Sequence, residues 1–344
     1  MNHTTIAVDL AKNVFEIGVS QEAGKVSEQL RVSRRQLVSF FAKRPAAKVL
    51  LEACGSAHFW ARRLRSFGHT VVLLPPHLVK PYRRGSKTDR ADTKALLEAY
   101  RNEEIRPVPI KSVPQHVLAA LHRLRSGWVS TRTARINAVR GILRELGHFI
   151  PKGAQFVLPA VTELVEDPES DLPDALRSHL EEACSEIREL KTKCTDIEHE
   201  LQALSKQLPE VQRLLTVPGV GLLTATAIVG FVGDLRRFRS GRCFASYLGV
   251  VPKENSSGDV RRLGRITKRG DSYIRCLLTH GGRSVLRAAH VSKSPPDKLR
   301  AWALKVHRSR GHNKAAIAVA NKLARIVWAV SAREESYQSA PVAA

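Results

Sequence analysis

Residues 48–74 read KVLLEACGSAHFWARRLRSFGHTVVLL, which is the pattern of a strand, a helix and a second strand. Lys48–Ala53 and Thr70–Leu74 are short apolar runs typical of buried strands, and Ala57–Phe67 has the apolar spacing of a helix. Three strands followed by alternating helices and strands indicate an α/β domain, in which helices pack against a mixed sheet. The upstream elements predicted in the same way are strands over Thr5–Asp9, Val14–Val19 and Glu28–Val32, and a helix over Ser33–Ala42.

The net charge points to a polyanionic partner. The 344 residues include 56 Lys and Arg against 32 Asp and Glu, a formal net charge of +24, and the pI is about 10.4. Such a field favours nucleic acid first and an anionic membrane surface second. Basic residues are dense between Leu235 and Arg275, where 11 bases stand against three acids. We therefore expect nucleic acid as a partner.

Membrane insertion and export are not expected. No apolar run approaches the roughly 18 residues that span a bilayer, and the start MNHTTIAVDLAK is too polar for a secretory signal. Five cysteines without a C-x-x-C pair argue against a zinc site and against a disulfide framework. We expect a cytoplasmic protein.

A long basic helix is predicted after the first hundred residues. Leucines, isoleucine and valine recur at helical spacing from Leu118 to Leu146, with arginines between them. The helix has either a solvated basic face or a face that contacts RNA or DNA, and the global charge favours contact. The candidate contact residues are Arg123, Arg132, Arg135 and Arg140.

An acidic helical arm is predicted next, after a connector broken by prolines over residues 147–173. Between Glu163 and Glu200 there are 13 acids and only four bases. Apolar residues recur there in strict 4–3 steps, which is the pattern of a coiled-coil seam. The seam fits either a hairpin within one chain or a pairing of protomers, and we favour a homo-oligomer, a dimer or tetramer. The seam residues are Ala183, Ile187, Leu190, Cys194, Ile197, Leu201, Leu204 and Leu208.

The C-terminal region is predicted to be mainly helical. It opens with a helix, the turn Pro218–Gly221 and a second helix, and its last helix is expected from about Asn313 to Ala332. Gly219 and Gly221 would allow a helix–hairpin–helix unit that grips a DNA backbone, although a tight turn between two core helices explains them equally well.

Four acidic residues of the first domain can be placed on these elements. Asp9 and Glu52 stand at the ends of two predicted apolar strands, where a charge is costly without a function. Asp89 and Asp92 share one face at the start of a helix. Taken alone, that pair is well explained as capping acids. Taken together, the four carboxylates favour a site for two Mg²⁺ or Mn²⁺ ions that catalyses phosphodiester chemistry, with Lys87 and Arg90 directed toward DNA.

These motifs resemble those of the DEDD-type insertion-sequence transposases, which are related to Piv-type DNA invertases and include bridge-RNA-guided recombinases. The resemblance rests on IAVDLAK, LLEACGS and KTDRADTKAL in the first half. In the second half it rests on VPGVGLLTATAIVGFVGDLRRF and CFASYLGVVPKENSSGDVRRLGRITKRGDSYIRCLL. It implies a RuvC-like, RNase H-type first domain whose metal ligands are the four acids. The expected domains are 1–150, a connector and coiled-coil arm over 151–208, a C-terminal transposase domain over 209–332 and a flexible tail over 333–344.

The resemblance also implies a nucleophilic serine on the loop after Leu248–Pro252. The family's serine precedes a glycine, which selects Ser257, although Ser256 directly before it leaves an alternative. A run of cations that follows is suited to bind flanking phosphates. These cations are Arg261, Arg262, Arg265, Lys268 and Arg269.

By the family's mechanism, the serine attacks a DNA phosphodiester and forms a covalent phosphoserine link, with acids and serine from different protomers. A guide RNA would pair with donor and target DNA, so that base pairing rather than a protein module reads sequence. The expected setting is a bacterial cytoplasm, with the protein at the nucleoid when active. The alternatives are a RuvC-type Holliday junction resolvase without serine chemistry and a non-enzymatic nucleic-acid-binding protein.

Overall fold

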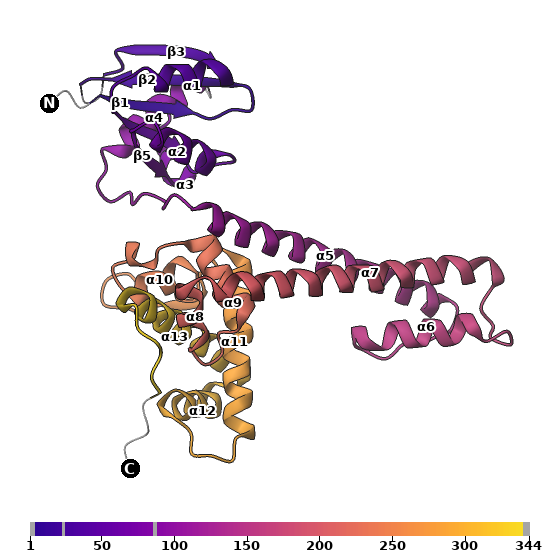
Figure 1. The fold of residues 1–344 in the computed structure, drawn as a ribbon. Coiled ribbons are helices and arrows are strands. Elements are labelled where there is room, and N and C mark those ends of the chain that lie inside the picture. The colour runs from indigo at the N-terminus through magenta and orange to yellow at the C-terminus, as the bar shows by residue number, and fades with distance from the viewer. Residues whose placement is uncertain (1–3, 23–24, 85–87, 340–344) are drawn as a thin grey trace. The chain divides into compact units, whose positions relative to one another are not determined.

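The computed structural model describes residues 4–22, 25–84 and 88–339 (Figure 1). The chain divides into two compact units, Met1–Val113 and Pro114–Ala344. The long basic helix α5 (Val113–Glu145) falls almost entirely in the second unit, whereas we expected it in a first domain ending at residue 150. It does so because its buried side chains pack against helices that come later in the chain.

The first unit is built on a five-stranded mixed sheet with the order β3-β2-β1-β4-β5. The first three strands are antiparallel neighbours, and β4 and β5 run parallel to β1. This order is compatible with an RNase H-like fold, and all five strands lie where the sequence predicts them. Their bounds are β1 (Thr5–Asp9), β2 (Val14–Ser20), β3 (Glu28–Ser33), β4 (Lys48–Glu52) and β5 (Thr70–Leu74).

Helices cover both faces of the sheet because the strand residues alternate in direction. Ile6 and Val8 pack with α1 (Arg34–Ala42) and α2 (Ala57–Arg65) on one face. Ala7 packs on the other face with α4. The remaining helices of this unit are α3 (Pro76–Val79), the 3₁₀ turn η1 (Lys80–Tyr82) and α4 (Asp89–Tyr100).

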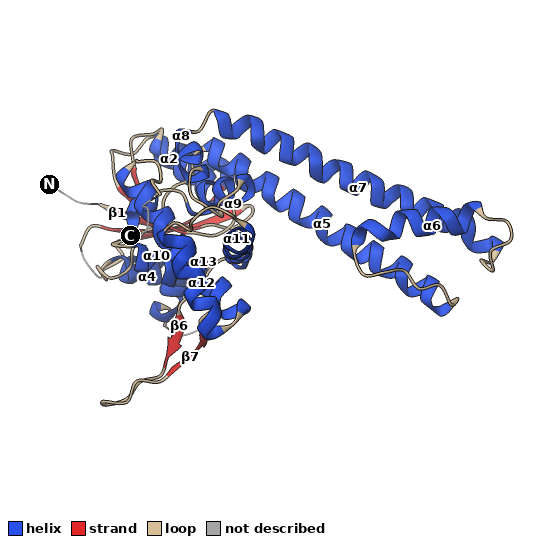
Figure 2. Ribbon diagram, turned by 90° about the horizontal axis from the view of Figure 1, so that it is seen from below, coloured by secondary structure: helices blue, strands red, loops and turns tan. Residues whose placement is uncertain are grey.

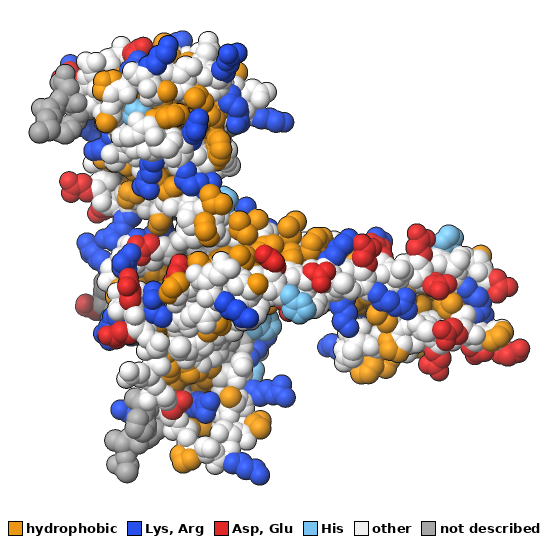
Figure 3. Space-filling view, in the orientation of Figure 1, with side chains coloured by type: hydrophobic (Ala, Val, Ile, Leu, Met, Phe, Trp, Pro, Cys, Tyr) orange, Lys and Arg blue, Asp and Glu red, His pale blue; other side chains and the backbone are white. Residues whose placement is uncertain are grey.

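The second unit begins with a helical arm. Helices α5 and α7 (Asp174–Lys206) lie side by side and antiparallel (Figure 1). Two ion pairs of 2.6 Å show that the helices run in opposite directions. Arg125 binds Glu198, whereas Arg135, which comes later on α5, binds Glu186, which comes earlier on α7. On the face drawn in Figure 3, acidic side chains gather toward the outer end of the arm.

The predicted seam on α7 is covered by the chain itself. Ile187 is 3% exposed and lies in one buried cluster with residues of α5 and α6 (Val157–Glu166), and Leu201 is fully buried with Leu118 of α5. The 4–3 spacing reveals a narrow apolar stripe but not which helix covers it. The stripe is therefore buried within one chain, which matches the hairpin alternative, and a homo-oligomer stays a prediction.

Truncating the seam tests this assignment. Leu201→Ala should lower the free energy of unfolding by about 2–5 kcal/mol, because it leaves a cavity in a fully buried contact. The loss of melting temperature should be the same at all protein concentrations, while Glu200→Ala, on the exposed side of α7, should change little. A loss that shrinks as protein concentration rises would show that the seam pairs protomers.

The connector also contains a helix that we did not predict. Residues Val157–Glu166 form α6, preceded by the 3₁₀ turn η2 (Ala154–Phe156). Pro159 suggested a break, but it stands in the first turn of α6, where a missing N–H is tolerated.

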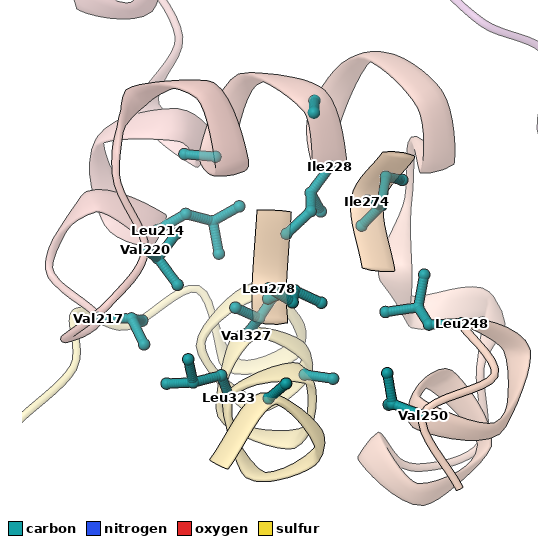
Figure 4. Close-up of a cluster of buried hydrophobic side chains, with 14 of the residues drawn as sticks. Leu214, Val217, Val220, Ile228, Leu248, Val250, Ile274, Leu278, Leu323 and Val327 are labelled. Carbon is teal, nitrogen blue, oxygen red and sulfur yellow. The ribbon is translucent and has the colours of Figure 1, made fainter. Parts of the chain in front are cut away.

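The rest of the second unit is a helical domain around α13, with the core shown in Figure 4. Leu323 and Val327 of α13 meet Leu278 of α11 at its centre. The strands that the structure describes in this unit form a two-stranded hairpin of β6 (Pro252–Glu254) and β7 (Leu263–Ile266), which projects beyond the helices in Figure 2. The other elements are α8 (Pro209–Leu215), α9 (Leu222–Ala227), the π turn η3 (Ile228–Val232), the 3₁₀ turn η4 (Leu235–Arg237), α10 (Gly241–Tyr247), α11 (Ser272–Val291), α12 (Lys298–Arg310) and α13 (His312–Arg333).

The turn between α8 and α9 packs against the domain's own core. Gly219 has a φ of +80°, and a Cβ atom there would lie 2.7 Å from the carbonyl oxygen of Gly281 in α11. This close approach explains the glycine without a DNA backbone. A helix–hairpin–helix function for this turn therefore stays a prediction.

Helix α13 is the one helix of the described chain that is long and apolar enough to cross a membrane by length and composition. Eight of its residues are buried in the domain core, which accounts for that apolar character. The segment after it, which we expected to be flexible, is held as far as it is described. The amide of Tyr337 donates a 2.8 Å hydrogen bond to Thr216, and Glu334 pairs with Arg236.

A buried histidine joins α5 to the helical domain. His122 is fully buried, with Nδ1 3.0 Å from the Tyr273 hydroxyl and Nε2 2.9 Å from Thr226 Oγ1. The Thr226 hydroxyl donates to Leu222, so its oxygen accepts from Nε2–H, and Nδ1 of a neutral ring accepts from Tyr273. Burial, with a smaller effect from Arg125, lowers the pKa of His122 to about 4.

This pKa predicts acid sensitivity. The folded pKa lies below the ordinary value of about 6.5, so folding favours the neutral ring. The contribution is complete above pH 6.5 and is lost as the pH falls toward 4, by up to about 3 kcal/mol. In His122→Gln, stability should therefore fall less than in the natural chain between pH 7 and pH 4.5, as measured by urea unfolding at each pH. Equal losses in the two proteins would contradict the assignment.

Candidate active site

Two of the predicted acids stand together at one edge of the sheet. Asp9 ends β1 and Glu52 ends β4, and these strands are parallel neighbours with Val8 opposite Leu51. Because side chains alternate along a strand, Asp9 follows the direction of Ala7 and Glu52 that of Leu50, toward α4. The two carboxylates therefore emerge on the same face, at the carboxyl ends of their strands.

Helix α4 brings the other two acids to this edge. Thr88 caps the helix by accepting a 3.2 Å hydrogen bond from the amide of Ala91. Asp89 and Asp92 lie in its first turn, and the next turn is anchored on the sheet by Ala95. All four predicted acids line one pocket of about 600 Å³. Its other lining residues are Pro76, His77, Val79, Lys80, Arg83 and Ala95.

The four carboxylates influence one another electrostatically. Burial, followed by the charges of Asp92, Asp89 and Glu52, raises the pKa of Asp9 from 3.8 to about 6. Arg83 partly neutralises the group through a 3.3 Å ion pair with Asp92. The pocket therefore concentrates negative charge that a bound cation would relieve.

The chemistry of this donor set fits a divalent ion. Carboxylate oxygens are the ligands that Mg²⁺ and Mn²⁺ accept. In the described part of the chain, no three acidic, histidine or cysteine side chains stand close enough to hold an ion without moving. Asp9, Glu52 and Asp92 are half-buried and Asp89 is exposed, so all four carboxylates keep access to solvent and to an ion.

A fifth acid lies at the same edge and was missed from the sequence. Glu16 of β2 is directly opposite Asp9 in the antiparallel pair, so both side chains are on one face. It is 6% exposed, and its carboxylate lies 3.7 Å from the guanidinium of Arg90. Its position in VFEIGV carried the same signal that identified Glu52, a charge within an apolar strand. Arg90 thus has a partner on β2 although its own side chain is 76% exposed, and Lys87 lies outside the described residues.

The predicted serines lie on the loop of the β6–β7 hairpin. Ser257 and Val260 form an isolated bridge there, with Gly258 between them at a φ of +56°. The Ser256 hydroxyl donates to Glu254 at 2.8 Å and accepts from the amide of Arg262 at 3.2 Å. The Ser257 hydroxyl has no hydrogen-bond partner among the described residues and is exposed.

Comparison with known proteins identifies the chain. The protein-family model for DEDD transposases of the IS110 type, whose description is "Transposase", matches residues 6–148. A second model, described as the transposase IS116/IS110/IS902 family, matches residues 211–295. The probable family 20 transposase of Pseudomonas aeruginosa is 41% identical over 340 residues, which cover 98% of this chain and 99% of that protein. The chain belongs to the IS110 family of transposases.

Other relatives agree with this assignment. The transposase for insertion sequence element IS1111A of Coxiella burnetii is 37% identical over 333 residues, 97% of this transposase and 91% of the relative. The pilin gene-inverting protein of Moraxella bovis is 29% identical over 97 residues, 27% of the chain and 30% of that protein. The resemblance stated from the motifs is confirmed, and the protein is a DNA transposase enzyme. Membership of the DEDD family implies a divalent metal ion.

Apart from Lys87 and Arg90, the predicted DNA-contacting cations of the transposase fall into two groups. On the hairpin, Arg261 forms a 3.3 Å ion pair with Glu254. The other four are exposed and have no ion-pair partner within the described residues. They remain available to bind phosphates: Arg262, Arg265, Lys268 and Arg269.

On α5 three of the four predicted arginines have intramolecular contacts. Arg135 binds Glu186 of α7, and Arg140 donates to the carbonyl oxygens of Pro151 and Gly153 at 2.6 and 2.7 Å. The guanidinium of Arg123 lies 5.8 Å from the ring centre of Phe231. The Nε of Arg132 is buried without a hydrogen-bond partner in the described chain. Part of this basic row therefore stabilises the arm.

Proposed function

We propose that this transposase cuts and rejoins DNA with two groups, a metal site formed by Asp9, Glu52, Asp89 and Asp92 and the nucleophile Ser257. One observation carries the proposal: the four acids, from two strand ends and one helix start, line a single pocket. Mg²⁺, or Mn²⁺ in its place, would supply Lewis-acid stabilisation of the phosphate oxygens. The chain's own contribution is to hold the ligand carboxylates on rigid elements.

Ser257 supplies the covalent step. Its Oγ attacks a backbone phosphorus and forms an Oγ–P bond, its proton passes to solvent or a base, and the displaced strand oxygen takes up a proton as a hydroxyl. The hydroxyl of a second strand then reverses the step and frees the serine. The absence of an intramolecular partner within the described residues favours Ser257, because Ser256 is held by Glu254 and Arg262. The neighbouring cations stabilise charge on the phosphate.

We further propose that donor and target DNA are selected by a noncoding bridge RNA. The net charge of +24 suits a protein that binds both nucleic acids. The test is to sequence the RNA that copurifies with the transposase expressed together with its native flanking DNA. A single species that matches those flanks is expected, and a random sample of cellular RNA would contradict the guided mechanism.

The mechanism uses an oligomer in which acids and serine come from different protomers. We infer that protomers pair through the exposed apolar face of α5, part of which is visible as orange side chains in Figure 3. Val117, Leu124 and Ile142 are 40%, 51% and 44% exposed, and their spacing puts them within about 20° of one helix face. A mixture of Asp9→Asn and Ser257→Ala protomers should regain activity that neither has alone.

A further inference from the structure

A groove of about 1080 Å³ lies in the second unit between α10, α12, α13 and the base of the hairpin. It contains none of the acids of the metal site. Four cations line it, and no acidic residue does. Within the described chain none of the four forms an ion pair. An unpaired cluster of this kind attracts an anion with several charges. The four cations are Arg242, Lys314, Lys322 and Arg325.

Half-buried apolar and aromatic side chains form the floor of the groove, and the exposed Arg242, Lys314 and Arg325 form its rim. Ile317 and Ile326 of α13 line it, together with Trp302 of α12. The ammonium of Lys322 lies 4.2 Å from the ring centre of Trp302, in a cation–π contact. Burial, with a smaller effect from Arg325, lowers the pKa of Lys322, so this cation is partly desolvated and gains more from an anionic ligand than a surface lysine does.

The walls are held in place by close packing. A Cβ atom on Gly241 would lie 2.8 Å from the Cα of Arg325, so α10 and α13 are in near contact. Asn321 donates a 3.2 Å hydrogen bond to the carbonyl oxygen of Val250, next to the hairpin. The groove is therefore formed before a ligand arrives, which lowers the entropic cost of binding.

We propose that this groove binds unpaired nucleotides of the DNA strand that Ser257 attacks. A duplex presents its phosphates outward and buries its bases, so it would meet the basic rim but not the apolar floor. A single strand offers phosphates to the rim and a base to Trp302, which is the pattern of single-strand binding sites. This inference rests on the proposed role of Ser257 and adds the substrate form that the domain holds.

The groove and the serine are joined by the hairpin. Pro252 and Ile266 line the groove and face each other at the base of β6 and β7. Ser257 is five residues beyond Pro252, at most about 17 Å along an extended strand. That length corresponds to about five nucleotide steps at the 3.4 Å spacing of a stacked strand, and to fewer steps where the strand is extended. The bound nucleotides should therefore lie within about five positions of the cleaved bond.

The test compares two double variants of equal charge in the full-length protein. Lys322→Gln with Arg325→Gln removes two groove cations, and Lys298→Gln with Lys305→Gln removes two exposed cations of α12 outside the groove. The affinity for a labelled single-stranded DNA should fall at least about tenfold in the groove variant. The slope of log affinity against log salt concentration should fall by the equivalent of about one to two released ions. Duplex binding and the control variant should change less than about threefold.

Crosslinking locates the strand directly. A 5-iodouracil placed within five nucleotides of the cleaved bond should crosslink to the peptide that contains Trp302, and Trp302→Leu should remove the crosslink and weaken single-strand binding by about five- to 100-fold. Equal loss in both double variants, crosslinks elsewhere, or loss of RNA rather than DNA binding would each overturn the proposal. Ser257→Ala separates the two proposals, because it should retain single-strand binding while losing the covalent step.

Discussion

Asp9→Asn should abolish strand transfer and at the same time give a protein that, without metal, is more stable at pH 7.5 than the natural chain. Both effects come from one carboxylate. The pKa of Asp9 in the folded protein is about 6, above the ordinary 3.8, so the ionised carboxylate destabilises the folded state. This destabilisation is fully present above pH 6 and disappears below about pH 4. Removing the charge should recover about 1–2 kcal/mol, allowing for the partial exposure of Asp9.

Metal titration provides the measurement. The melting temperature of the natural chain should rise with Mg²⁺ or Mn²⁺, because an ion that binds only the folded state stabilises it by mass action. Asp9→Asn should lose most of that rise together with strand transfer. Glu103→Gln removes an exposed acid outside the pocket and should behave like the natural chain. Full activity of Asp9→Asn, or an undiminished metal response, would refute the metal site.

Ser257→Ala should remove the covalent DNA–protein adduct and reduce recombination by at least about 1,000-fold, as loss of a nucleophile does. Ser256→Ala should keep the adduct. It loses only the hydrogen bonds to Glu254 and Arg262, each worth about 1 kcal/mol, which loosens the hairpin loop and costs a few-fold in rate.

The adduct can be trapped on a nicked DNA substrate and detected as a labelled band that survives denaturation. Peptide mapping of the trapped product should place the DNA on Ser257. A product on Ser256, or Ser257→Ala with normal recombination, would show that the serine is wrongly chosen. The absence of any adduct with the natural protein would point instead to hydrolysis by metal alone.

Much of the first unit was predictable from short-range patterns. Apolar runs such as Thr5–Asp9 and Thr70–Leu74 predict strands, and the helix predicted to start at Ser33 is present, with Ser33 as its cap in a capping box. The position of Asp9 and Glu52 at strand ends indicated a site as well. What joined them was the parallel pairing of β1 with β4, a contact between segments about 40 residues apart that no local pattern specifies.

The errors share a physical cause, which is that a local pattern does not name its partner. The α7 stripe predicted burial correctly but not the helix that covers it. Pro159 interrupts the sequence pattern that predicts a helix, but it does not interrupt α6. The sequence predicts a loop where the β6–β7 hairpin lies, because the two strands are short and exposed and therefore lack an apolar alternation. Glu16 carried a signal, but its neighbour across the sheet was needed to give it a role.

The order in which the arm is synthesised has a consequence for how chains meet. The apolar side chains of α5 around Leu143 are covered by residues of α7 near Ile187. At 5–20 residues per second, a ribosome needs about 2–9 s to make that covering segment. During this interval α5 of a nascent chain is open to α7 of a neighbour translated from the same message. Polysomes therefore offer this transposase a route to a domain swap, in which two chains exchange α7. The swap would form during translation rather than by collision of finished proteins.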